Sequence, residues 1–350
     1  MPETLKPLAR NQAGTGTFLT PDIGSQLNET KLAPSTLETG RAGRGGLVEG
    51  LTTRPLTIPS KFFYDDRGSA LFDAICDLPE YYPTRTEQAL LDQVSRVIAT
   101  RTGARQLVEL GAGMARKTRH LIRAHFELNE RLHYLPLDIS PYSLDQAEAL
   151  LSQEFPGLNI TGIQCDYTED LDGLETDPGC LAIFLGSSIG NFTHAKGVAL
   201  LQRLRARMAA GDWFLLGVDL VKPVKILEAA YNDSAGVTAD FNKNILEVVN
   251  RELGGDFEPD DFRHLAIFND EASQVEMYLV ARHAVGVRLE ALDLDLEIAS
   301  GERIRTEISR KFTRESTARL LTDAGFDLTD WLPSEDRYVA LALARVDGDR

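Results

Sequence analysis

Residues 106–118 read Gln-Leu-Val-Glu-Leu-Gly-Ala-Gly-Met-Ala-Arg-Lys-Thr, a pattern typical of a strand that leads through a tight turn into a helix. A short apolar run encloses the acidic Glu109 and is followed by Gly111 and Gly113. Because glycine carries no Cβ, a turn built on these two residues lets the backbone approach a nucleotide-like cofactor closely. The stretch therefore predicts the first strand and turn of a cofactor-binding βαβ unit.

A second apolar run, at residues 132–137, ends at Asp138, whose carboxylate could accept hydrogen bonds from both hydroxyls of a ribose. The glycine pair alone is weak support for a cofactor site, because many strand-to-helix turns need glycine. The third glycine of the dinucleotide fingerprint is missing, since Arg116 stands in its place. This difference favours S-adenosylmethionine over NAD as the cofactor.

Apolar runs alternate with helix-like segments along the middle of the chain. The runs lie at residues 107–110, 132–137, 159–165, 180–185 and 213–218. Helical periodicity occurs at residues 88–100, 117–126, 143–154 and 196–208. This alternation predicts an α/β fold, with a mostly parallel, Rossmann-like sheet covered by helices on both faces. Ligands of such sheets bind at the carboxyl ends of the strands.

The pattern changes after Val221. A helical region follows at residues 224–253, and strand-like segments follow at residues 275–282, 287–292 and 304–312. These segments predict a second, smaller α+β domain that binds the substrate. Residues 317–324 and 338–346 then predict a helix and a last strand that returns to the main sheet.

The same changes predict the domain boundaries. Residues 1–50 are rich in glycine, threonine and proline, and we expect a flexible N-terminal arm there. We expect the domain that holds the cofactor at residues 85–221 and 312–350. The substrate-binding domain is expected at residues 51–84 and 222–311, with a cleft between the two domains.

The composition is that of a globular enzyme, with 350 residues, 43% hydrophobic and 26% charged. The formal net charge of -16 disfavours a nucleic-acid partner, because phosphate binding needs a clustered basic surface. No apolar run reaches the roughly 20 residues that span a bilayer, and residues 1–50 lack the apolar core of a signal peptide. We therefore expect a cytoplasmic monomer that contacts no membrane and acts on a small molecule.

Cysteine and histidine give no sign of a metal site. Cys76, Cys165 and Cys180 have no ligand-like spacing, and their odd number provides no disulfide framework. Free, buried thiols are expected, as is usual in a reducing compartment. The six histidines also lack ligand spacing, so we assign none of them to metal binding or catalysis.

The glycine turn is only one part of a longer resemblance. From about Ile58 to Val346, the chain resembles the histidine Nα-methyltransferases of ergothioneine biosynthesis. The resemblance rests on several long motifs in the family's order and near-constant spacing, at residues 61–65, 78–87, 108–113, 184–191 and 219–222. It implies trimethylation of the α-amino group of L-histidine to hercynine, with S-adenosylmethionine as the methyl donor.

The resemblance also implies roles for individual residues. The cofactor-binding residues would be Gly111, Gly113, Lys117, Asp138, Asp166 and Tyr167. The substrate carboxylate would bind Tyr81 and Tyr231, the amine would lie near the catalytic residues Tyr64 and Asn191, and the imidazole would lie between Glu307 and Ser309. The rest of the substrate site would be formed by Phe72, Met277 and Gly186. The proton acceptor is left unassigned.

Some of these positions also have simpler interpretations. Tyr167 departs from the phenylalanine expected in the family, and Phe72 and Met277 taken alone are more typical of a core. Glu307 lies in an alternating segment where a charged residue usually faces solvent, although Ser309 shares its strand face two residues on.

Three other functions compete with histidine methylation. Methylation of another aromatic amino acid, such as tryptophan, would use the same core, but an indole needs no carboxylate opposite its N–H. A nonenzymatic protein that binds S-adenosylmethionine would need only the cofactor residues. An NAD-dependent oxidoreductase is disfavoured because the third glycine is missing.

Overall fold

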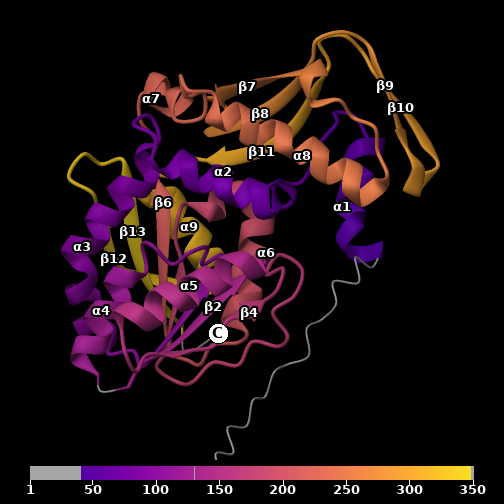
Figure 1. The fold of residues 1–350 in the computed structure, drawn as a ribbon. Helices are drawn as coiled ribbons and strands as arrows, with labels where there is room; N and C mark the ends of the chain where they lie inside the picture. The colour runs from indigo at the N-terminus through magenta and orange to yellow at the C-terminus, as the bar shows by residue number, and fades with distance from the viewer. Residues whose placement is uncertain (1–40, 130, 348–350) are drawn as a thin grey trace, which may run out of the picture. The chain divides into compact units, whose positions relative to one another are not determined.

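The computed structural model describes residues 41–129 and 131–347, and an eight-stranded sheet forms its centre (Figure 1). The strand order is β12-β13-β6-β5-β1-β2-β3, and β4 also pairs with β2. The strands are β1 (Gln106–Leu110), β2 (His133–Asp138), β3 (Asn159–Ile160), β4 (Ile163–Gln164), β5 (Leu181–Phe184), β6 (Trp213–Asp219), β12 (Phe326–Pro333) and β13 (Val339–Val346). Strands β1 to β6 pair in parallel, whereas β13 is antiparallel to β6 and to β12. The predicted α/β sheet is confirmed.

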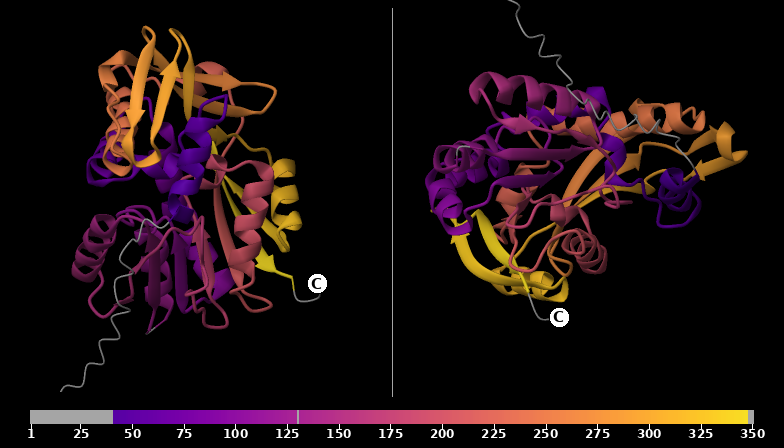
Figure 2. Two further views of the ribbon diagram at one scale, coloured as in Figure 1. Left: turned by 90° about the vertical axis from the view of Figure 1, so that its right-hand side faces the viewer. Right: turned by 90° about the horizontal axis from the view of Figure 1, so that it is seen from below.

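Helices cover both faces of this sheet. They are α3 (Tyr82–Thr102), α4 (Arg119–Leu128), α5 (Pro141–Glu154), α6 (His194–Arg205) and α9 (Arg314–Asp323). Successive side chains of a strand point to opposite faces, so Leu107 of β1 packs with α3, α4 and α5, whereas Val108 packs with α6 and α9. All of β1 is buried, which explains its continuous apolar pattern. Figure 2 shows the C-terminal strands, in yellow, at one edge of the sheet.

A second core is built from segments on either side of the cofactor motifs in the sequence. It contains a three-stranded antiparallel sheet in the order β11-β8-β7 and a two-stranded hairpin. The strands are β7 (Phe262–Asn269), β8 (Gln274–Ala281), β9 (Val285–Leu289), β10 (Leu294–Ile298) and β11 (Arg303–Arg310). The helices are α1 (Arg41–Thr52), α2 (Asp66–Cys76), α7 (Val224–Ala229) and α8 (Val237–Leu253). Four short 3₁₀ helices complete the described elements, namely η1 (Ser60–Phe63), η2 (Ser188–Asn191), η3 (Pro259–Asp261) and η4 (Glu290–Leu292).

Several elements differ from the prediction. The helical region at 224–253 is two helices, because the chain turns between them at Gly236, whose φ of 79° is left-handed. The run at 159–165 is divided between β3 and β4, and the strand expected at 287–292 ends at Leu289. Strands β7 and β12 were not predicted, since both are only partly buried and their polar residues weaken the apolar signal.

The last ten residues of the predicted flexible N-terminal arm are helical in the structure. Residues 1–40 lie outside the described residues, but residues 41–50 belong to α1. Leu47 and Leu51 of this helix are fully buried in the second core, so this end of the predicted arm is folded. The division of the chain into a cofactor domain and a substrate domain stays a prediction.

The described cysteines are free, as the sequence predicts. Cys180 is buried, whereas Cys76 and Cys165 are only partly so. Between residues 41 and 347, leaving aside residue 130, no helix is both long and apolar enough to cross a membrane.

Candidate active site

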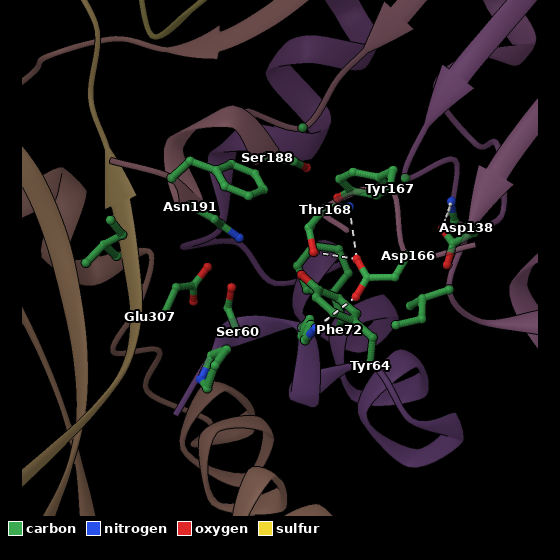
Figure 3. Close-up of a pocket in the computed structure, with 18 of the residues that line it drawn as sticks. Ser60, Tyr64, Phe72, Asp138, Asp166, Tyr167, Thr168, Ser188, Asn191 and Glu307 are labelled. Carbon is green, nitrogen blue, oxygen red and sulfur yellow. Dashed lines mark hydrogen bonds and ion pairs between the residues drawn. The ribbon is translucent and has the colours of Figure 1, made fainter. Parts of the chain in front are cut away.

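A cavity of about 800 Å³ lies at the carboxyl ends of β1, β2 and β5 and extends to β11. Figure 3 shows Asp138, Asp166 and Tyr167 at one end of this cavity and Asn191 and Glu307 at the other. A smaller cavity of about 40 Å³ shares part of the wall of the large one and continues beyond it.

All the residues that the sequence suggested for the site line one cavity or both. The large cavity is lined by the predicted cofactor residues Gly111, Gly113, Lys117, Asp138, Asp166 and Tyr167. Both cavities are lined by Tyr64, Phe72, Tyr81, Gly186, Asn191 and Glu307. The small cavity alone is lined by Tyr231, Met277 and Ser309. The fold therefore brings together residues that are far apart in the chain.

The glycine turn after β1 has the conformation that its sequence predicts. Gly111 and Gly113 have φ values of 64° and 52°, in the left-handed region that favours glycine. A Cβ at Gly111 would lie 3.3 Å from the hydroxyl oxygen of Tyr167, whereas a Cβ at Gly113 would meet no atom within 4 Å. The side of the turn at Gly113 is therefore open to a bound molecule.

Asp138 is the last residue of β2 and is fixed to this turn by its carboxylate. One oxygen accepts a hydrogen bond from the backbone N–H of Gly113 at 2.8 Å, and the other accepts one from the N–H of Ser140 at 2.9 Å. Burial raises the pKa of Asp138, although these backbone hydrogen bonds oppose the change. Each carboxylate oxygen keeps a further lone pair, so the pair of ribose hydroxyls expected here fits the donors and acceptors present.

Asp166 lies in the loop after β4 and already has three hydrogen bonds. Its first oxygen accepts from the backbone N–H of Thr168 at 2.9 Å and from the Thr168 hydroxyl at 2.5 Å. Its second oxygen accepts from the ammonium of Lys61 at 2.9 Å, and that ammonium also donates to Glu169 at 2.9 Å. Desolvation lowers the pKa of Lys61, but the two carboxylates outweigh it and raise the pKa overall. The sequence did not point to Lys61 as a partner of Asp166.

Lys117 is not a free cation beside the cofactor cavity. Its ammonium donates to Glu87 of α3 at 2.6 Å, and the Glu87 side chain is only 2% exposed. Desolvation lowers the pKa of Lys117, but the Glu87 carboxylate raises it overall. Glu87 was part of a recognised motif without a predicted role.

Aromatic rings form one wall of the cavity at the end that contains Glu307. The ring of Phe72 packs edge to face against Tyr64 at 5.8 Å and against Tyr81 at 6.1 Å between centroids. Tyr81 in turn packs edge to face against Tyr231 at 6.3 Å. Burial raises the pKa of Tyr64 well above its usual value, and the nearby Glu307 adds to this effect, so the phenol stays neutral.

Asn191 and Glu307 lie opposite this aromatic wall. With its amide nitrogen turned toward them, Asn191 donates to the backbone oxygen of Ile308 at 3.2 Å and to Glu307 at 3.3 Å. Desolvation raises the pKa of Glu307 to about 7, although Lys311 and Asn191 lower it. Glu307 therefore faces the cavity rather than bulk solvent, unlike most charged residues of an alternating strand.

Tyr231 and Ser309 hydrogen-bond to a buried ionic cluster. The ammonium of Lys311 donates to Tyr231 at 3.0 Å, to Ser309 at 2.9 Å and to Asp219 at 2.8 Å. Asp219 also accepts from Lys222 and from the Tyr82 hydroxyl. Tyr231 donates to Ser309 at 2.8 Å. Because both hydroxyl oxygens accept from Lys311, the pair keeps one hydroxyl hydrogen to donate into the small cavity.

Sequence reasoning missed the buried partners of the site. Four of these partners occur inside motifs that resemble the family, which was the available signal, namely Lys61, Glu87, Asp219 and Lys222. Lys311 stood out only after folding. Their partners are distant in sequence, as with Lys61 and Asp166, which are 105 residues apart. Periodicity cannot reveal such pairs.

The parallel sheet, the glycine turn, the acidic residue at the end of β2 and the cavity at the strand ends fit a methyltransferase that uses S-adenosylmethionine. The chain belongs to the family of histidine-specific, S-adenosylmethionine-dependent methyltransferases, whose sequence profile matches residues 44–346.

Several characterised relatives support this membership. The chain is 44% identical to the histidine N-alpha-methyltransferase of Mycolicibacterium smegmatis, over 84% of this chain and 92% of the relative. It is 39% identical to the enzyme of the same name from Mycobacterium tuberculosis, over 86% of this chain and 94% of the relative. It is also 30% identical to the ergothioneine biosynthesis protein 1 of Schizosaccharomyces pombe, over 66% of this chain and 31% of that longer protein.

Proposed function

We propose that the protein transfers three methyl groups from S-adenosylmethionine to the α-amino group of L-histidine and forms hercynine, a step of ergothioneine biosynthesis. The observation that carries this proposal is the large cavity, which has Asp138 and the glycine turn at one end and Asn191 and Glu307 at the other. The family and the names of the mycobacterial and fission yeast relatives support the substrate and the pathway.

The cofactor end has donors and acceptors that suit S-adenosylmethionine. Asp138 would accept hydrogen bonds from the ribose hydroxyls, and Asp166 with Tyr167 would contact the adenine. Lys117 would attract the carboxylate of the methionine part. When bound, the sulfonium supplies an already activated methyl group, so the protein needs no covalent catalysis.

The substrate end must hold the amine uncharged and aligned. The amine of a free amino acid is mostly protonated at neutral pH, so the site must favour the neutral form before each transfer. Tyr64 and Asn191 would hold the nitrogen by hydrogen bonds, and a neutral phenol at Tyr64 is no strong base. The faces of Tyr64 and its aromatic neighbours would attract the methylated product, which is a permanent cation.

The imidazole would be recognised by two different groups. Glu307 would accept its N–H, while the hydroxyl hydrogen of the Tyr231 and Ser309 pair would be donated to its unprotonated nitrogen or to the substrate carboxylate. An indole offers an N–H but no second ring nitrogen, so histidine fits better than tryptophan. The predicted cytoplasmic location, monomeric state and independence of metal stay predictions.

Mass spectrometry tests the proposal directly. The protein is incubated with S-adenosylmethionine and each proteinogenic amino acid in separate reactions. We expect gains of one, two and three methyl groups on histidine alone. Methylation of tryptophan in preference to histidine, or of no amino acid at all, would overturn the proposal.

A further inference from the structure

Glu87 is a buried carboxylate of α3 that the proposed chemistry does not use directly. Its exposed fraction is 2%, and it does not line either cavity described above. Carboxylates are almost never fully buried unless they are paired, because removal from water disfavours the charge. Its position therefore depends on the groups that it binds.

Two of those groups belong to different parts of the proposed site, one to the cofactor site and one to the substrate site. Glu87 accepts from the ammonium of Lys117 at 2.6 Å, on the cofactor side. Its two oxygens also accept from the backbone N–H of Gly186 at 2.9 and 3.1 Å, in the loop that continues into η2 and Asn191. One carboxylate thus holds a cation of the cofactor site and the loop that carries a predicted catalytic residue.

The sheet leaves space for this carboxylate. A Cβ at Gly217 of β6 would lie 2.0 Å from an oxygen of Glu87 and 3.3 Å from the Cα of Leu185. Any side chain at that position would displace Glu87. A Cβ at Gly186 would lie 3.0 Å from the Lys117 ammonium nitrogen, so the three groups are closely packed.

We infer that Glu87 is a positioning residue that holds the Lys117 ammonium toward the cofactor and fixes the Gly186 loop beside the substrate. The inference rests on the proposed function, since it assigns Lys117 to the carboxylate of S-adenosylmethionine. Cys76 of α2 and Glu109 of β1 also face Lys117, but among the described residues they hydrogen-bond to other groups and not to its ammonium. Glu87 acts through Lys117 and Gly186 and does not touch the reacting atoms.

The test uses Glu87→Gln, which keeps an oxygen for Gly186 but removes the charge that pairs with Lys117. Calorimetry measures the Kd of S-adenosylmethionine, without histidine, at pH 7 and pH 9. We expect Glu87→Gln to raise this Kd by about tenfold at pH 7. The loss should grow at pH 9, because a desolvated ammonium without its carboxylate gives up its proton more easily. The amine of S-adenosylmethionine titrates too, so each Kd is compared with the wild-type value at the same pH.

A double-mutant cycle separates positioning from a general structural effect. Lys117→Met should weaken binding by itself, and Glu87→Gln added to Lys117→Met should change the Kd by less than about twofold. The double variant leaves no unpaired charge in the interior, because both members of the buried ion pair are replaced by neutral side chains. Such a replacement is often tolerated by the fold. Glu154→Gln is the matched control, because Glu154 pairs with Arg119 and Arg123 of α4 and lines neither cavity.

Two results would overturn the inference. One is an unchanged Kd for Glu87→Gln at both pH values in a variant with a wild-type thermal melt. The other is that Glu87→Gln raises the Kd of S-adenosylmethionine by the same factor in the wild-type protein and in the Lys117→Met variant. Histidine methylation by the wild-type protein is measured separately, so failure of the proposed function would not be confused with failure of this inference.

Discussion

Glu307 is the residue whose chemistry most directly distinguishes imidazole from other aromatic side chains. It lies on β11 and faces both cavities, with Asn191 as a hydrogen-bond donor at 3.3 Å. We predict that Glu307→Ala lowers kcat/KM for histidine by about 10- to 150-fold, because a hydrogen bond to a charged group contributes about 1.5–3 kcal/mol. Activity on phenylalanine, whose ring has no N–H for Glu307 to accept, should hold steady or rise, since the pocket becomes wider and less charged.

The measurement is kcat/KM for both amino acids in the wild type and the variant, with thermal melts as the control for folding. An equal fall for both substrates would contradict the role of Glu307 in recognising imidazole.

The raised pKa of Glu307 also predicts a pH dependence of stability. Desolvation raises this pKa from 4.5 to about 7 in the folded protein. The folded state therefore binds more protons than the unfolded state between these values, and its stability falls as the pH rises through them. Glu307→Gln cannot ionise, so its stability relative to the wild type should increase between pH 5 and pH 8, by about 2–3 kcal/mol. Denaturant unfolding at both pH values measures this, and a pH-independent difference would contradict it.

Asn191 is expected to affect methyl transfer more than cofactor binding. Its amide reaches Glu307 and the Ile308 backbone, whereas Asp138, which binds the glycine turn, lies at the other end of the cavity (Figure 3). We predict that Asn191→Ala lowers turnover on the order of 100-fold, because a small error in attack geometry is costly. The Kd of S-adenosylmethionine should stay near the wild-type value. Tyr64→Phe is the milder comparison, since its ring remains; turnover of Asn191→Ala near wild type would remove Asn191 from the catalytic residues.

At the level of elements, the turn between β1 and α4 forms the cofactor end. We predict that Gly111→Val greatly weakens S-adenosylmethionine binding, because valine is strained at a φ of 64° and its Cβ would press on Tyr167 at 3.3 Å. Asp138→Ala should lose about 1.5–3 kcal/mol of binding free energy through its ribose hydrogen bonds. Calorimetry checks both variants. Unchanged affinity in folded proteins would reject this turn as the cofactor site.

At the level of the whole molecule, Asp219 forms an ion pair between the eight-stranded sheet and the three-stranded sheet. It ends β6 of the large sheet and binds Lys311, which directly follows β11 of the small sheet, at 2.8 Å. The backbones also meet here, since the N–H of Phe312 donates to the oxygen of Asp219 at 2.8 Å. Desolvation raises the pKa of Asp219, but the two lysines lower it overall, so the carboxylate stays ionised.

We predict that Asp219→Asn destabilises the protein by about 3–5 kcal/mol, because it leaves buried ammonium groups without their carboxylate. The KM for histidine should also rise, since Lys311 would no longer hold Tyr231 and Ser309 in place. Chemical denaturation and kinetics measure the two effects. Asp323→Asn is the control: it removes an exposed pair with His194 and should change stability by less than about 0.5 kcal/mol. Equal behaviour of the two variants would contradict the proposed connection.

The sequence by itself determined the parts of this protein that depend on local pattern. The parallel strands were visible because buried strands such as β1 are continuous apolar runs, and the turn was visible because Gly111 and Gly113 need left-handed backbone. The partly buried and partly polar strands β7 and β12 were missed, since their apolar periodicity is weak. Site residues such as Glu307 were suggested by resemblance, because the pattern of their own segment indicated a solvent-facing position.

Only the tertiary structure decided which charges are paired and which face the cavity. Glu87 and Gly186 are 99 residues apart in the chain, and Lys311 and Asp219 come from different sheets. The energy of such pairs depends on burial and on distances of a few ångströms, which no sequence spacing records. The pattern of the chain therefore determined the sheet and the cofactor turn, whereas the packing of the two cores determined the electrostatics of the site.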